Sequence, residues 1–172
     1  RAREMRRRAR RVAYRAPAAV GYPPVVVTTV TLAIMLAAGA GLRMGRPKAL
    51  VPWEGVPLAF AHAVAARAQG CGVVRVVVRA HVAAQLPTPP DGGFWCVSQE
   101  DDALGPAGSL GVAAREGLDD GLVAVSPVEL DADAWRCVPT LAGVIAEGVD
   151  AAKPLFEGHR GHPVVLRAGV LA

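Results

Sequence analysis

Runs of apolar residues alternate with amphipathic segments along most of this chain. The apolar runs are rich in β-branched residues, which favours buried strands, and they lie at 25–36, 73–78, 94–98 and 121–128. The segments between them repeat apolar residues at helical spacing, which predicts helices at 57–70, 80–86, 107–118 and 132–148. Two short extended pieces follow at 153–158 and 162–168. This alternation predicts an α/β fold of three layers, in which helices cover both faces of a mostly parallel, Rossmann-like sheet.

Turn-forming residues set the expected ends of these elements. Pro57 suits the first turn of its helix, and Gly70 suits the end of the same helix. Asp131 or Asp133 is the expected N-cap of the last helix, and Pro139 is a candidate break within it.

The composition agrees with this architecture. Hydrophobic residues make up 52% of the 172 residues and aromatic residues only 5%, so we expect a core of Ala, Val and Leu in a single domain. Such a core suits parallel strands covered by helices. Cys71, Cys96 and Cys137 are widely spaced and form no zinc pattern, so we expect core cysteines in a cytoplasmic protein.

Basic residues are concentrated at the start of the chain. Residues 1–24 contain eight arginines and one glutamate, a charge of +7, so the formal net charge of +4 leaves −3 for the rest. We therefore expect residues 1–24 to be a disordered basic extension, and residues 25–172 to form a domain that does not bind nucleic acid. Binding of the extension to RNA or to an anionic lipid is the alternative for that segment.

The same region resembles an export signal, because a basic head precedes an apolar run that ends in small residues. Pro23 and Pro24, and the β-branched residues after them, favour a strand over the helix of such a signal. The chain holds no uninterrupted apolar stretch of membrane-spanning length. We expect neither export nor a membrane partner.

A glycine-rich loop, LAAGAGLRMGRPKAL, closes the first predicted strand. It lies at the edge of the sheet where open α/β folds bind ligands. Its three glycines let successive N–H groups converge on a phosphate, and Arg43 and Lys48 add positive charge. The loop lacks the Gly-Lys-Ser/Thr of a Walker A motif and the spacing of a dinucleotide fingerprint. A plain glycine-rich turn with solvated cations is the alternative on composition alone.

This loop resembles the signature of the MobA-like nucleotidyltransferases, and through RMGRPKALVPWEGVPL it is closest to their molybdenum-cofactor cytidylyltransferase branch. The segment GPAGSLGVAAREGL resembles the family's glycine–serine turn, which opens a helix near the nucleotide. The segment GHRGHPVVL resembles a Gly-His-Pro segment on the acceptor side of the cytidylyltransferases. The resemblance spans most of residues 30–166 and implies the nucleotide-diphospho-sugar transferase type of the predicted fold.

The resemblance implies transfer of a nucleoside monophosphate from an NTP to a phosphorylated acceptor, with release of pyrophosphate. CTP is favoured over GTP, molybdopterin is the implied acceptor, and a molybdoenzyme or a maturation factor is the implied protein partner. The residues expected to bind the nucleotide are Leu36, Ala37, Ala38, Gly39, Gly41, Arg43, Lys48, Arg79, Gly108 and Ser109. Arg79 itself departs from the family, which commonly has a glycine-containing turn there, and solvation of the loop is its alternative role. Arg43 and Lys48 are the expected catalytic residues, because cations stabilise the charge that develops as pyrophosphate leaves. Gly161 and His162 are expected on the acceptor side.

The resemblance also implies Mg²⁺, which the family holds through an aspartate just after a central strand. Glu129 stands at the corresponding position, and its extra methylene displaces the carboxylate. Mg²⁺ tolerates such a displacement poorly, because it demands near-octahedral geometry. Asp131 or Asp133 is the alternative ligand, unless all three residues only form the acidic start of a helix.

Two departures from the family pattern keep other functions open. Glu129 replaces the family's aspartate, and the chain stops at Ala172, before a later acidic motif, so we expect a domain truncated at its C-terminus. The first alternative is a degenerate module that binds a nucleotide without catalysis. The second is a nucleotidyltransferase that acts on a sugar phosphate.

Overall fold

The computed structural model describes residues 29–98, 105–115, 117–118, 120–128, 131–146 and 148–171. The basic extension predicted at residues 1–24 lies outside these residues, and so does the beginning of the strand predicted at 25–36.

Six strands form the central sheet, in the order β5-β4-β1-β6-β10-β7. Four of them run parallel: β1 (Val30–Leu36), β4 (Val73–Arg79), β5 (Gly93–Ser98) and β6 (Leu122–Pro127). Two antiparallel strands continue the sheet beyond β6: β10 (Val164–Arg167) and β7 (Ala151–Ala152). The predicted α/β fold with a mostly parallel sheet is therefore confirmed.

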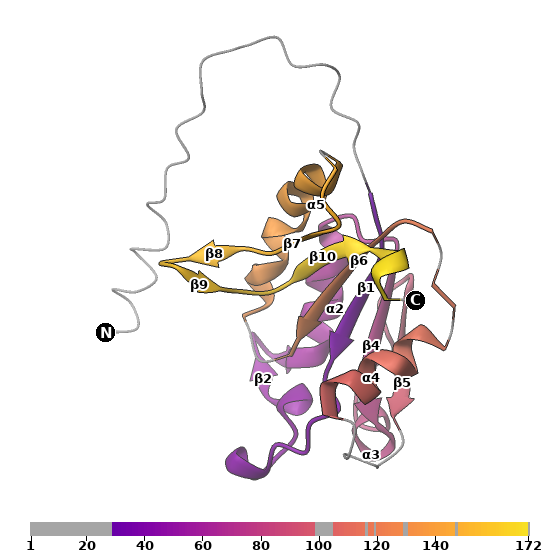
Figure 1. The fold of residues 1–172 in the computed structure, drawn as a ribbon. Helices are drawn as coiled ribbons and strands as arrows, with labels where there is room; N and C mark the ends of the chain where they lie inside the picture. The colour runs from indigo at the N-terminus through magenta and orange to yellow at the C-terminus, as the bar shows by residue number, and fades with distance from the viewer. Residues whose placement is uncertain are drawn as a thin grey trace.

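Helices cover both faces of this sheet, as Figure 1 shows. The helices α2 (Leu58–Ala68) and α5 (Val138–Ala146) pack on one face, and α4 (Gly105–Ala114) packs on the other. Successive side chains of a strand point to opposite faces, so the parallel strands contribute residues to two separate apolar clusters. Burial on both faces explains why the strands are apolar along their whole length. Within the described residues, no helix is long and apolar enough to cross a bilayer.

The last predicted helix consists of two pieces. The 3-10 helix η4 (Ala132–Cys137) comes first and α5 follows at once. Asp131 is the N-cap, because its Oδ1 accepts a hydrogen bond from the backbone N–H of Asp133 at 2.9 Å. Pro139 falls in the first turn of α5, where its missing N–H leaves no helical hydrogen bond unmade. The predicted break at Pro139 therefore marks the start of a second helix.

Helix α4 begins at Gly105, two residues before the predicted start at 107. Gly105 has a φ of 52°, and Pro106 follows it with a φ that the ring already fixes near the helical value. Gly108 and Ser109 lie inside the helix, as the predicted range 107–118 has them, whereas the family resemblance implies a turn that opens the helix.

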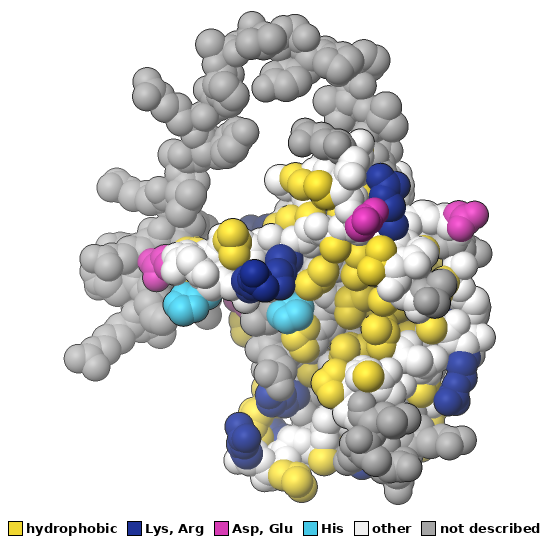
Figure 2. Space-filling view, viewed as in Figure 1, with side chains coloured by type: hydrophobic (Ala, Val, Ile, Leu, Met, Phe, Trp, Pro, Cys, Tyr) yellow, Lys and Arg dark blue, Asp and Glu magenta, His cyan; other side chains and the backbone are white. Residues whose placement is uncertain are grey.

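Short elements connect these layers. The hairpin β2 (Pro52–Trp53) and β3 (Val56–Pro57) precedes α2, and α3 (Ala80–Ala83) follows β4. A second hairpin, β8 (Leu155–Phe156) and β9 (His159–Arg160), projects from the central sheet in Figure 1. Basic, histidine and apolar side chains all lie on this projecting hairpin in Figure 2.

Candidate functional site

The glycine-rich loop leaves the sheet at the point where three strands lie side by side. The N–H of Ala37 donates to the carbonyl of Val77 in β4 at 2.9 Å, and the N–H of Val128, just after β6, donates to the carbonyl of Leu36 at 3.1 Å. The chain passes from β1 to β4 on one side of β1 and later returns to β6 on the other side. The loop therefore starts at the switch point of the sheet, where open α/β folds bind ligands.

The loop closes on itself through Gly41. This glycine has a φ of 66°, and a Cβ built on it would lie 1.8 Å from the carbonyl oxygen of Arg46. The N–H of Met44 also donates to the carbonyl of Gly41 at 2.9 Å. Ala49 is fully buried and fixes the returning end of the loop in the core. The loop is therefore anchored at both ends, by strand β1 at its start and by the buried Ala49 at its return.

Backbone donors are left over at the start of this loop. Hydrogen bonds within the described residues use the N–H groups of Ala37, Met44 and Gly45, but not those of Gly39, Ala40 or Gly41. A Cβ at Gly39 would find no atom within 4 Å, so the space beside this backbone is open. Successive unused N–H groups in a turn are the donors that an anion requires.

The two predicted catalytic residues, both of them cationic, lie in different parts of the loop and differ in solvent exposure. Arg43 is in the exposed 3-10 turn η1 (Leu42–Met44), and Lys48 begins η2 (Lys48–Leu50) next to the buried Ala49. Lys48 is half-buried, whereas Leu42 beside Arg43 is 89% exposed. The loop extends beyond the carboxyl ends of the parallel strands in Figure 1, and Figure 2 shows basic and apolar side chains there. The structure thus places one cation at the tip and one near the base.

Arg79 is brought to this loop from the end of β4. Its Nε donates a hydrogen bond to the carbonyl of Ala38 at 2.8 Å, across 41 positions of sequence. The side chain is half-buried. The sequence predicts Arg79 among the nucleotide-binding residues, and the structure sets it against the backbone of the predicted phosphate loop.

Helix α4 is held by a buried arginine that the sequence analysis missed. Arg75 is 8% exposed, and its Nη1 donates to the carbonyl of Ala113 at 2.9 Å and to that of Gly117 at 2.5 Å. Carbonyl groups at a helix C-terminus lack helical partners and carry a partial negative charge, so a guanidinium satisfies both needs. The available signal was one arginine inside the apolar strand VVRVVV. Gly108 and Ser109 are half-buried in the helix that Arg75 holds.

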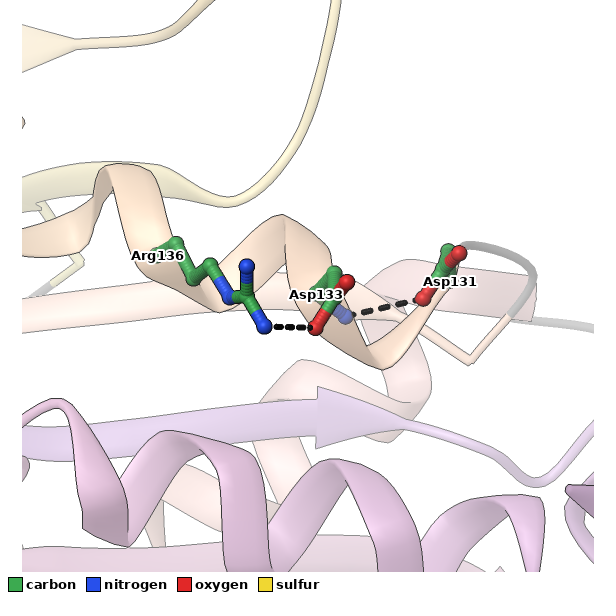
Figure 3. Close-up of polar contacts among 3 residues, drawn as sticks. All are labelled: Asp131, Asp133 and Arg136. Atoms are coloured by element: carbon green, nitrogen blue, oxygen red, sulfur yellow. Dashed lines mark hydrogen bonds and ion pairs between the residues drawn. The ribbon is translucent and has the colours of Figure 1, made fainter. Parts of the chain in front are cut away.

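The acidic residues near the end of β6 serve a helix. Asp131 caps η4, and Oδ1 of Asp133 forms an ion pair with Nη2 of Arg136 at 2.9 Å; Figure 3 shows both contacts. No group of three His, Cys, Asp or Glu residues in the described part of the chain could hold a metal ion. Glu129, the predicted metal ligand, lies outside the described residues. Within the described residues, the contacts of Asp131 and Asp133 are those of a helix start, and we derive no chemical step through a metal.

The predicted acceptor-side residues lie at the same edge of the sheet as the loop. Strand β10 runs antiparallel to β6 and pairs Val164 with Val125, so the residues just before β10 lie level with the carboxyl end of β6. The N–H of Gly161 donates to the carbonyl of Pro154 at 2.8 Å, and His162 is exposed. Both residues thus lie between the projecting hairpin and strand β10.

An open α/β sheet with a glycine-rich, cation-bearing loop at its switch point defines a nucleotide-binding type of domain. A family model described as "MobA-like NTP transferase domain" matches residues 33–172, and the chain belongs to this family. The predicted family resemblance is confirmed by this match, and the class of the protein is that of the nucleotidyltransferases. No curated protein matches the chain in sequence.

Solved structures show the same fold at low sequence identity. The Rv0371c complex with manganese from Mycobacterium tuberculosis H37Rv is 20% identical, with a TM-score of 0.62 over 83% of this chain and 73% of that one. The Rv0371c homologue from Mycobacterium sp. strain JC1 is 20% identical, with a TM-score of 0.60 over 81% and 71%. A nucleotidyl transferase from Methanothermobacter thermautotrophicus (Mth528) is 20% identical, with a TM-score of 0.50 over 81% and 72%. At these identities the similarity shows the fold.

Proposed function

We propose that this protein transfers a nucleoside monophosphate from an NTP, with CTP favoured over GTP, to a phosphorylated acceptor, with molybdopterin favoured. The family match supports the reaction class. The single observation that carries the proposal is the loop between β1 and η2. It combines the unused N–H groups of Gly39, Ala40 and Gly41 with two cations, at the switch point of the sheet.

The reaction requires stabilisation of negative charge more than covalent help from the protein. A phosphate oxygen of the acceptor attacks the α-phosphorus, and one oxygen–phosphorus bond forms. The bond from that phosphorus to the oxygen shared with the β-phosphate breaks, and its electron pair leaves with pyrophosphate. Donors that are already oriented stabilise this charge without reorganisation during the reaction.

The residues divide these tasks by position. We assign the phosphates to the N–H groups of the loop, and the developing charge on pyrophosphate to Arg43 and Lys48. Leu36, Ala37 and Ala38 would lie beside the nucleoside at the start of the loop. The residues proposed to complete the site are Gly108 and Ser109 on the nucleotide side and Gly161 and His162 on the acceptor side.

We propose that Glu129 holds a divalent cation, Mg²⁺, which would supply further positive charge at the phosphates when bound. The Rv0371c structure named above is a manganese complex, which motivates a test with both metals. A molybdoenzyme or a maturation factor remains the proposed protein partner.

A non-catalytic nucleotide-binding module is the second candidate. The observation that favours it is that Asp131 caps η4 and Asp133 pairs with Arg136, so both carboxylates already have partners within their own helix. A transferase that acts on a sugar phosphate is the remaining alternative and differs only in the acceptor.

The decisive experiment measures pyrophosphate release with CTP or GTP and a phosphorylated acceptor, molybdopterin or a sugar phosphate, in Mg²⁺, in Mn²⁺ and in a chelator. We expect metal-dependent release, faster with CTP and with molybdopterin. Lys48→Ala should lower turnover by several orders of magnitude, because it removes a charge aimed at the leaving group; roughly 10²–10³-fold is typical for one such donor.

Arg115→Ala is the matched control, since Arg115 is an exposed cation just after α4 and outside the proposed site. This variant should release pyrophosphate at the same rate as the natural chain. Full activity of Lys48→Ala would contradict the proposed catalytic role. If the protein binds nucleotide in the presence of the chelator but releases no pyrophosphate under any condition, it is the non-catalytic nucleotide-binding module.

A further inference from the structure

Arg79 contacts the backbone of the loop through a specific atom. Its Nε donates to the carbonyl of Ala38 at 2.8 Å, and the N–H of the preceding residue, Ala37, donates to Val77 of the same strand at 2.9 Å. Strand β4 therefore holds two successive residues of the loop, one through its backbone and one through a side chain. The contact between Arg79 and the Ala38 carbonyl sets the orientation of the peptide group that joins Ala38 to Gly39.

The carbonyl of Ala38 and the N–H of Gly39 belong to one peptide group. This peptide is trans, so its C=O and N–H lie in one plane and point in opposite directions. Holding the carbonyl toward Arg79 therefore turns the N–H of Gly39 away from Arg79.

The space on the Gly39 side suits a ligand. The N–H of Gly39 has no acceptor among the described residues, and a Cβ on Gly39 would meet no atom within 4 Å. The unused N–H of Gly39 and this open space thus belong to the same residue, at the end of the peptide group that points away from Arg79.

We propose that Arg79 is a positioning residue for the triphosphate: by holding the carbonyl of Ala38 it aims the Gly39 N–H at a phosphate, and its role does not require that it bind a phosphate itself. This inference rests on the proposed function. It replaces the direct nucleotide contact that the sequence analysis expects of Arg79 with contact through the backbone.

Three substitutions separate these two roles. Arg79→Gln removes the charge but keeps a donor nitrogen at the same number of bonds from Cα as Nε. Arg79→Lys keeps the charge but moves the nitrogen one bond further out. Arg79→Met has a similar length and no donor. A positioning role depends on the donor at the Nε position, whereas direct phosphate binding depends on the charge.

The measurement is the dissociation constant for CTP by calorimetry, together with kcat and KM for pyrophosphate release. We expect Arg79→Met and Arg79→Lys to weaken CTP binding by roughly tenfold or more, and Arg79→Gln to restore it to within about threefold. Rescue by Arg79→Lys but not by Arg79→Gln would show direct charge recognition and overturn the inference. An affinity for CTP that is unchanged in all three variants, or that falls by the same factor in all three, would overturn the inference as well.

A second readout works without nucleotide. In ¹⁵N–¹H spectra the Gly39 amide resonance should move in Arg79→Met and Arg79→Lys and stay near its natural position in Arg79→Gln. An unmoved Gly39 amide in all variants refutes the positioning role. If the natural chain binds no NTP, the proposed function fails, while this amide pattern still decides whether Arg79 sets the orientation of the peptide.

Discussion

The three glycines of the loop have different structural roles. Gly41 combines a φ of 66° with a backbone carbonyl that a Cβ would overlap, Gly45 has a φ of 67° with open space, and Gly39 has open space without a positive φ. The sequence presents all three as equally suited to an anion loop. The close approach of Gly41 to Arg46 exists only after the loop has closed, so composition and spacing could not reveal it.

This difference predicts a graded response to alanine. Gly41→Ala should lower the free energy of unfolding the most, by about 2–3 kcal/mol, because strain and steric overlap add together. Gly45→Ala should lower the free energy of unfolding by about 1 kcal/mol, because only the positive φ opposes a side chain there. Gly39→Ala should lower it by less than about 0.5 kcal/mol. Urea denaturation of the three variants measures this order. Equal losses at Gly41 and Gly39 would contradict the closed geometry of the loop.

Helices α2 and η4 are joined by one buried polar contact. His62 and Trp135 are both fully buried, and Nε1 of Trp135 donates to Nδ1 of His62 at 3.0 Å. The two rings meet edge to face, with centroids 6.5 Å apart and planes at 83°. His62 falls within the helix predicted at 57–70, and its full burial makes it a packing residue. The partner lies 73 positions away, beyond the reach of helical periodicity.

His62→Leu should lower the free energy of unfolding by about 1–3 kcal/mol, because the indole N–H of Trp135 would stay buried without this acceptor. Trp135→Phe removes the donor and also some volume. In the double variant the second change should cost less than it does alone, with a coupling of about 1 kcal/mol. Chemical denaturation of the four proteins completes the cycle. Strict additivity would show that the contact contributes nothing to stability.

Across the whole molecule, the alternation of strands and helices predicted the layers correctly but left the strand order open. Periodicity reports which face of an element is buried and carries no information about its neighbour. The placement of β6 beside β1, and the antiparallel addition of β10 and β7, follow from how the chain crosses the sheet. The site depends on this order, because it puts the loop at the switch point.

The core also fixes how stability changes with pH. Burial raises the pKa of the Cys71 thiol from 9.0 to about 11, with an opposing contribution from nearby Arg67. The folded protein therefore keeps this proton over a pH range in which the unfolded chain loses it. The stability from this group is complete below pH 9 and falls as the pH rises toward 11.

We expect the free energy of unfolding to fall more steeply between pH 9 and 11 in the natural chain than in Cys71→Ala, with a difference of at most about 3 kcal/mol. Urea denaturation at several alkaline pH values gives both curves. Comparing their slopes removes the constant effect of the lost packing and the titration of other groups. Parallel curves would contradict a raised thiol pKa.

The sequence by itself determined the features that depend on neighbouring residues. The positions of the main strands and helices, an N-cap at Asp131 or Asp133, an interruption near Pro139 and the glycine-rich loop all follow from local backbone preferences and from periodicity. The tertiary structure alone decided which distant groups meet. Arg75 satisfies the end of α4, and Arg79 holds the Ala38 carbonyl. A hydrogen bond needs a partner at a fixed distance and angle, and for Arg75 and Arg79 only folding brings that partner within reach.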